Sequence, residues 1–388
     1  MFVIHLTFIF IDVQMCYLEQ YKERPTMQHE RITLGVGAFV LAIGALVTAQ
    51  VGPSPSRTTN EATTNPRKLG IANMATVPVP VRAVYFEGSA GRCDASGNIY
   101  VRPLPPGGAL GQDLLPVQKI TSAGKLAEMF YLPDNNFLDR GLFVTAGGDV
   151  FRMGFDRDAG NAFEVLKFHR NGSVQSKVRL EIERGFFPWH LAIFPGGEFL
   201  LSGVVDRTTP KAVLFTPAGK LVKTIYEPED EEARKQTSGH DPRYLLNPAA
   251  SPDAGVYEEL GDAAVGPDGN VYLLRAAPPA LVFVISSKGE VIRKFRVDPG
   301  DSNLISSSIW IHHNQLAVAF QPRRGNPALA MVKVVDLKGR ALASYALEPP
   351  DESDFRTYIG DMACYRQDGI TFVHPAQTEV HLRKVTQK

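Results

Sequence analysis

The feature that most constrains this chain is an internal repeat of short apolar strands separated by tight polar turns. A strand–turn–strand element recurs at 92–101, 142–151, 191–201, 263–274, 309–318 and 363–373. Its turn residues, which lie 45 to 72 positions apart, are Gly97, Gly148, Gly197, Gly269, Asn314 and Gly369. Gly or Asn suits a two-residue hairpin turn, because positive φ costs a residue with a Cβ about 1 kcal/mol. The pattern therefore predicts six hairpins.

A second element follows each of the first five hairpins, and it consists of an apolar run, a glycine turn and a further strand. Its glycines, which lie 20 to 27 residues after the first turn, are Gly124, Gly172, Gly219, Gly289 and Gly339. The final strand alternates apolar and polar residues, as in KLVKTIY at 220–226. This alternation is typical of an edge strand with one solvated face. Each repeat therefore predicts four strands.

Four-stranded units of about 45 residues are typical of a β-propeller, in which a blade buries its faces only against its neighbours. The sixth unit ends after its third strand at 379–385, and the strand-like segment 77–86 has no other partner. We expect 77–86 to supply the missing outer strand and to close an all-β, six-bladed ring over 73–388. A seventh, degenerate blade within 227–259 and a β-sandwich are the alternatives.

Several of these repeats resemble a known family. They read PDGNVYLL (267–274), ASGNIYVRP (95–103), SKGEVIRKF (287–295) and PAGKLVKTI (217–225). These sequences are similar to NHL-repeat-type and TolB-like six-bladed propellers of exported bacterial proteins, over roughly residues 75–388. The resemblance implies the fold and leaves the function open, because such propellers include scaffolds, binding proteins, lyases and lactonases. Lactonase-like members imply calcium or zinc as the candidate cofactor.

Composition narrows the class of protein. Hydrophobic residues make up 44% of the 388, and the 41 Lys and Arg equal the 41 Asp and Glu. Such a chain can bury a large core, so it is not globally disordered. A formal net charge of zero also argues against a nucleic-acid partner, since nucleic-acid binding requires a basic face.

The N-terminal segments are interpreted as a targeting region. Residues 27–49 combine a charged start, the apolar run 32–47 and small residues before Gln50, as in a cleaved secretory signal peptide. The alternative is a retained membrane anchor over 32–51, which is just long enough to span a bilayer. We interpret 1–26 as an over-extended start and 50–72 as a flexible linker. The expected location is extracytoplasmic, either periplasmic or secreted.

Candidate site residues lie where the inner strands are expected to begin, seven or eight positions before each turn residue. These positions include Arg140, Trp189, His190, Asp262 and Asp361. Asp262, Asp361 and His190 form a candidate metal site, while Arg140 suits an anionic substrate. The alternative is that each Gly-Asp pair caps a strand by accepting N–H groups of the next blade, and we favour it. His312 and His313 end another inner strand, where alternation sends one side chain into the channel.

Two further features bear on function. Cys93 and Cys364 lie on the inner strands of the first and last blades, which become neighbours when the ring closes. They are predicted either to form a disulfide or to remain two buried thiols. The irregular segment 227–259 joins two blades, and we interpret it as a partial lid or a tolerated insertion.

These observations favour a binding or scaffold module over an enzyme. Its ligand would lie at the channel mouth under 227–259, and its partner would be a protein, peptide or glycan. The competing hypothesis is a metal-dependent hydrolase or lyase, lactonase-like, with its site in the channel. No H-E-x-x-H, Cys-x-x-Cys or G-x-S-x-G motif occurs in the sequence, so no nucleophile is assigned.

Overall fold

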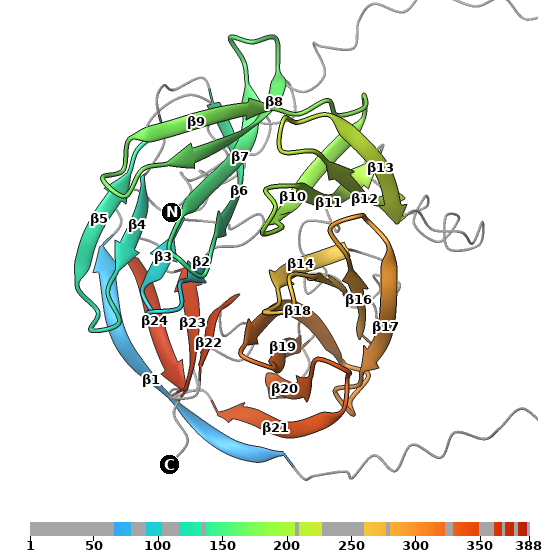
Figure 1. The fold of residues 1–388 in the computed structure, drawn as a ribbon. Coiled ribbons are helices and arrows are strands. Elements are labelled where there is room, and N and C mark those ends of the chain that lie inside the picture. The colour runs from blue at the N-terminus through green and yellow to red at the C-terminus, as the bar shows by residue number, and fades with distance from the viewer. Residues whose placement is uncertain are drawn as a thin grey trace, which may run out of the picture. The chain divides into compact units, whose positions relative to one another are not determined.

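The six repeats fold into six four-stranded sheets arranged in a ring, as the computed structural model of the chain shows (Figure 1). The structure describes residues 66–78, 91–102, 116–132, 137–205, 209–226, 260–276, 280–322, 329–348, 361–366, 369–375 and 379–385. The segments 1–26, 27–49 and 227–259 lie outside these ranges. Within the described residues, no helix has the length and apolarity that crossing a membrane requires. The fold is all-β, as predicted.

Each blade is an antiparallel sheet whose four strands follow one another in order from the channel to the rim. Blade 1 consists of β2 (Gly91–Cys93), β3 (Ile99–Val101), β4 (Val117–Ile120) and β5 (Leu126–Phe130). Blade 2 consists of β6 (Phe137–Val144), β7 (Val150–Asp156), β8 (Ala162–Phe168) and β9 (Val174–Arg179). Blade 3 consists of β10 (Phe186–Ile193), β11 (Phe199–Val205), β12 (Thr209–Phe215) and β13 (Leu221–Tyr226). The fourth and fifth are β14 (Leu260–Val265), β15 (Val271–Arg275), β16 (Ala280–Ile285) and β17 (Val291–Val297); and β18 (Leu304–His312), β19 (Gln315–Pro322), β20 (Met331–Asp336) and β21 (Ala341–Glu348). The sixth is β22 (Asp361–Arg366), β23 (Gly369–Pro375), β24 (Glu379–Val385) and β1 (Arg67–Pro78).

The closing strand β1 confirms the predicted ring closure but lies earlier in the chain than predicted. It runs over Arg67–Pro78, so the prediction of 77–86 is wrong, and the predicted linker 50–72 overlaps a strand from Arg67 onward. From Ile71 to Pro78 it pairs antiparallel with β24, and its first four residues pair parallel with β21. Blades 5 and 6 therefore share one eight-stranded sheet. Backbone groups make these pairs, so the apolar pattern alone did not reveal them.

A disulfide provides a second closure, between the inner strands of blades 1 and 6. Cys93 of β2 and Cys364 of β22 are bonded, with their Cα atoms 5.3 Å apart. The splaying of inner strands therefore does not separate them beyond the limit of about 7 Å for a disulfide. The disulfide joins the first and last blades covalently near the channel, whereas β1 completes the last blade at the rim by pairing with β24 and β21.

The tight turns use three loop residues in most blades, one more than predicted. In the turn before β3, Gly97 donates its N–H to the Asp94 carbonyl, and Asp94 donates its N–H to the Asn98 carbonyl. The third loop residue then takes positive φ, which is 80° at Gly97. Blade 5 does have a two-residue turn, but its positive φ of 52° falls on His313 rather than on Asn314.

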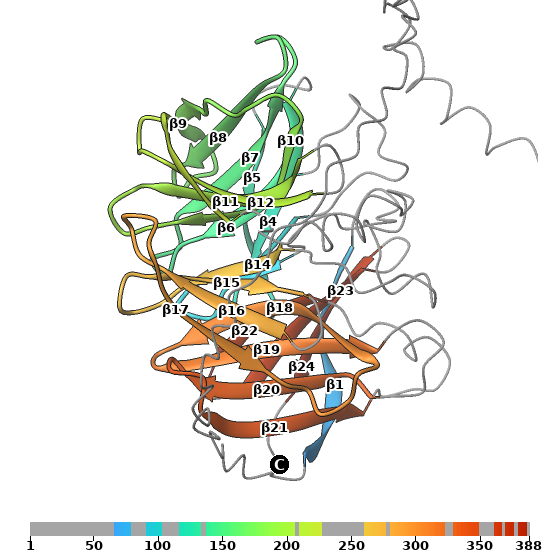
Figure 2. The same cartoon turned by 90° about the vertical axis from the view of Figure 1, so that its right-hand side faces the viewer.

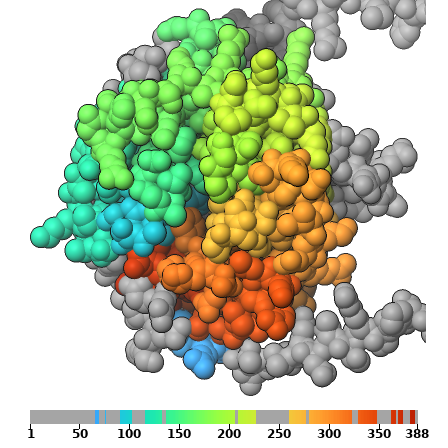
Figure 3. Space-filling model, viewed as in Figure 1, coloured from blue at the N-terminus to red at the C-terminus, as the bar shows by residue number. Residues whose placement is uncertain are grey.

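The core lies between the blades. Middle strands such as β7 and β11 are buried almost throughout, whereas the outer strands β13 and β17 are mostly exposed. Consecutive blades pack side by side around the ring (Figure 3). The strands run between two faces (Figure 2). We call the one that carries the turns from first to second strands the turn face, and the one where inner strands begin the entry face.

Candidate functional site

Inner strands of blades 2 to 6 each carry a β-bulge near the entry face. The register shifts between Asp139 and Gly141 in β6, between Pro188 and His190 in β10, and between Leu260 and Ala263 in β14. Shifts also occur in β18 and β22. Bulges redirect side chains and free backbone N–H groups from the ladder. In β6, β10 and β14 the bulges coincide with Arg140, Trp189 and Asp262, three of the positions predicted from the sequence.

Asp262 illustrates this role. Its carboxylate is 2% exposed and pairs with the guanidinium of Arg92 from blade 1. It also accepts the N–H of Ala263 at 2.8 Å and that of Ile309, in blade 5, at 3.2 Å. The strand-cap interpretation that we favoured therefore describes Asp262, and the ion pair with Arg92 adds a contact across the channel.

A second buried carboxylate joins blades 1 and 2. The Oδ2 atom of Asp139 accepts from Arg102 at 3.1 Å and from Arg152 at 2.7 Å, and both guanidinium groups are almost fully buried. Burial by itself would raise the pKa of Asp139, but the two arginines outweigh it and hold that pKa below its ordinary value. This cluster was not predicted from the sequence.

His190 lies close enough to the first of these pairs to be affected by its charges. Burial lowers the pKa of His190 to about 4; Asp262 opposes the shift, while Arg92 and Arg102 add to it. Its Nδ1 atom is buried and has no hydrogen-bond partner among the described residues. The imidazole is therefore neutral near pH 7.

The remaining predicted site residues do not converge with these two on a metal site within the described residues. Arg140 and Trp189 are half-buried at bulges in different blades. Asp361 begins β22, and its side chain lies outside the described part of the structure. Among described side chains, no group of three His, Cys, Asp or Glu residues is placed to hold a metal ion. With Asp262 already bonded, the described donors do not fit a cation, and a site that includes Asp361 stays a prediction.

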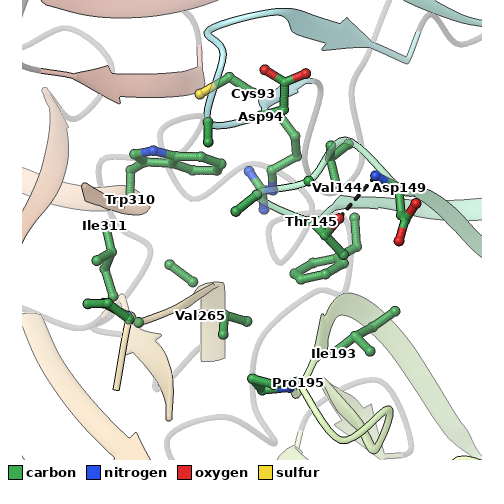
Figure 4. Close-up of a pocket in the computed structure, with 18 of the residues that line it drawn as sticks. Cys93, Asp94, Val144, Thr145, Asp149, Ile193, Pro195, Val265, Trp310 and Ile311 are labelled. Carbon is green, nitrogen blue, oxygen red and sulfur yellow. Dashed lines mark hydrogen bonds between the residues drawn. The ribbon is translucent and has the colours of Figure 1, made fainter. Parts of the chain in front are cut away.

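The channel instead holds a cavity of about 1110 Å³ that opens at the turn face. Its wall includes the residue four positions before the turn residue in every blade, a set we call the cavity ring: Cys93, Val144, Ile193, Val265, Trp310 and Tyr365. Figure 4 shows five of them around the cavity, with the Trp310 ring reaching towards its middle. The periodicity that revealed the fold therefore also marks the cavity, at positions deeper along the inner strands than those we chose.

Further residues complete the cavity. Phe143, Phe151 and Ile311 extend the apolar wall. Arg92, which forms the ion pair with Asp262, also lines the cavity. His312 and His313 both line it, contrary to the alternation argument, because His313 belongs to the turn and not to β18. Their ring centroids lie 4.1 Å apart. Aromatic side chains thus occur both in the wall of the cavity and at its opening on the turn face.

No protein-family model matches the chain, and no curated protein shows significant similarity to it. Among solved structures, a luciferin-regenerating enzyme is 9% identical and aligns over 80% of this chain and 95% of its own, with a TM-score of 0.48. A gluconolactonase from Xanthomonas campestris is 11% identical over 81% and 98%, with a TM-score of 0.45. An aldose sugar dehydrogenase from Streptomyces coelicolor, solved with PQQ, is 10% identical over 82% and 99%, with a TM-score of 0.43. All three scores lie below 0.5, so the fold assignment rests on this chain's own strand pairing.

Proposed function

We propose that this chain is a binding protein whose small-molecule ligand occupies the cavity at the turn face. The observation that carries the proposal is the cavity ring, through which all six blades contribute to one concave and mostly apolar wall. Small-molecule sites share this character, and they enclose roughly 300–1,000 Å³. A ligand bound there would contact every blade, so binding would also stabilise the closed ring.

The location of the ligand differs from the expectation of a site under 227–259. That expectation placed a protein, peptide or glycan partner at the entry face, where Arg140, Trp189 and Asp262 lie. Asp262 is engaged in holding blades together, whereas the turn face offers a formed cavity. An entry-face partner remains a separate proposal for the same molecule.

An exported location is part of the proposal. The disulfide between Cys93 and Cys364 supports it, because disulfides persist in oxidising compartments such as the periplasm. The candidate signal peptide at 27–49 supports the same location from the sequence.

The two tryptophans of the chain provide the test. A Trp189→Phe variant leaves Trp310 as the single tryptophan, and Trp310 lines the cavity. We expect ligands found by screening a small-molecule library to change Trp310 fluorescence saturably. The matched Trp310→Phe variant, which keeps only Trp189, should report little change. A saturable response from Trp189 alone would place the ligand at the entry face and contradict the proposal.

The competing function is a metal-dependent hydrolase or lyase that uses His190, Asp262 and Asp361. One observation favours it, namely the buried and unpartnered Nδ1 atom of His190 beside Asp262. Thermal melting with calcium, zinc or a chelator distinguishes the two functions. A cation at a hundred times its dissociation constant should add about 2.7 kcal/mol to the free energy of unfolding. A rise in melting temperature that Asp361→Asn abolishes would favour the enzyme.

A further inference from the structure

We infer that the ligand of the turn-face cavity is a neutral, largely apolar ring compound that carries a hydrogen-bond acceptor. The inference rests on the proposed function, since it names the chemical class of molecule that the same cavity would take. It follows from the charges, the surfaces and the donor that line the cavity.

The cationic side chains of the lining already have partners. Arg92 pairs with Asp262, and Arg366 donates to the Ala95 carbonyl at 2.9 Å. Lys167 lies 3.5 Å from an Asp149 carboxylate oxygen, and its Nζ sits 5.6 Å from the centre of the Phe151 ring. An anionic ligand would therefore compete with these partners for the cations.

The acidic side chains of the lining are engaged as well. Asp94 is 7% exposed, and its carboxylate accepts three hydrogen bonds. Asn98 donates two of them, from its backbone N–H at 3.0 Å and from its side-chain Nδ2 at 2.8 Å, and the Tyr100 hydroxyl donates the third at 3.1 Å. Asp149 is the partner of Lys167. The buried carboxylate of the lining thus already accepts hydrogen bonds, and a cationic ligand would have to compete with them. Burying a charge without a partner is costly, so the lining favours neutral molecules.

The remaining wall is suited to a flat ring. Val144, Ile193 and Val265 face the cavity opposite the Trp310 indole (Figure 4). Aromatic rings stack on such a platform and bury apolar surface at the same time. The volume of about 1110 Å³ accommodates a molecule of two or three fused or linked rings together with water.

Trp310 also supplies the polar element of recognition. Its indole N–H makes no hydrogen bond with the residues that the structure describes, and the ring lines the cavity. Indole donates and does not accept, so a ligand that satisfies it carries an acceptor such as a carbonyl or ether oxygen. A few such groups commonly fix the orientation of a ligand in an apolar pocket.

Two probes that differ only in charge test the class of ligand. N-phenyl-1-naphthylamine is neutral, and 8-anilinonaphthalene-1-sulfonate has the same ring system with a sulfonate added. We expect the neutral probe to bind at least tenfold more tightly, measured by energy transfer from Trp310 in the Trp189→Phe background. Equal affinity, or preference for the sulfonate, would overturn the inference while leaving the cavity as a binding site.

A matched pair of isoleucines locates the bound probe. Ile311 lines the cavity, whereas Ile292 is 51% exposed on the outer strand β17. Ile311→Asp should weaken binding of the neutral probe at least tenfold, and Ile292→Asp should leave it unchanged. The reverse result would place the probe on the rim strands and overturn the inference. Circular dichroism of both variants establishes that they are folded.

The acceptor is tested with 2-acetylnaphthalene, which has a carbonyl, and 2-ethylnaphthalene, which has none. Trp310→Phe keeps a ring but removes the donor, so it should weaken the ketone several-fold more than the hydrocarbon, by calorimetry. An equal loss of affinity for both compounds would overturn the inference that the ligand carries an acceptor. If none of the naphthalene probes binds while other compounds change Trp310 fluorescence, the ligand class alone fails. If no compound changes it, the proposed function fails too.

Discussion

At the residue scale, Asp262 joins three blades: its own blade 4, blade 5 through the Ile309 N–H, and blade 1 through Arg92. Asp262→Asn keeps the shape but leaves the Arg92 guanidinium buried without its carboxylate. We expect the free energy of unfolding to fall by about 3–5 kcal/mol in urea denaturation. Glu128→Gln is the control, because its pair with Lys119 is partly exposed and should change stability by under about 1 kcal/mol. Equal effects of the two substitutions would contradict a buried ion pair.

His190 makes a pH-dependent contribution at the same scale. Its pKa falls from the ordinary value near 6.5 to about 4 on folding, mainly through burial. Between these pH values the unfolded chain binds more protons, so stability is full above about 6.5 and decreases as the pH falls towards 4. We expect His190→Gln to remove roughly 1–3 kcal/mol of this decrease. Chemical denaturation at pH 7, 5.5 and 4.5 measures the free energy of unfolding of both proteins. An equal decrease with falling pH in the two proteins would contradict the lowered pKa of His190.

At the element scale, the outer turns pack each blade onto the one before it. A Cβ at Gly219, in the turn before β13, would clash with the Arg179 carbonyl oxygen at the end of β9. Gly197 in the same blade also has a left-handed φ. A Cβ added there would lie 3.5 Å from its nearest neighbour, the Pro217 side chain, which is an ordinary van der Waals contact. Both alanine variants should lose about 1 kcal/mol for positive φ, and Gly219→Ala should lose at least about 1 kcal/mol more. Similar melting temperatures would show that the turn yields without cost.

At the scale of the whole molecule, the ring is closed by β1 and by a disulfide between residues 271 positions apart. Denatured, unreduced protein that begins at Gln50, after the predicted signal peptide, should titrate with no thiol before reduction and with two after it. Replacing Cys93 and Cys364 with serine should lower the free energy of unfolding by about 2–5 kcal/mol, because the unfolded chain gains freedom. Two thiols without reduction would contradict the disulfide.

The repeats themselves were predictable because they depend on local physics. Alternation of apolar residues, glycine at positive φ and the 45-residue spacing are properties of neighbouring residues, and they predicted the blade number and the third strand 379–385. The loop length at Gly97 and the positive φ at His313 were not predicted, because turn type depends on how two strands pair.

The sequence by itself therefore determined the all-β, six-bladed architecture and the need for a closing strand. Only the tertiary structure decided that Arg67–Pro78 is that strand, that Asp262 pairs with Arg92, and that the cavity ring, which includes Trp310, lines a space open at the turn face. The physical reason is that these features join residues from different blades. Such contacts depend on ring closure and on bulges that redirect side chains, and neither leaves a periodic signal in one strand.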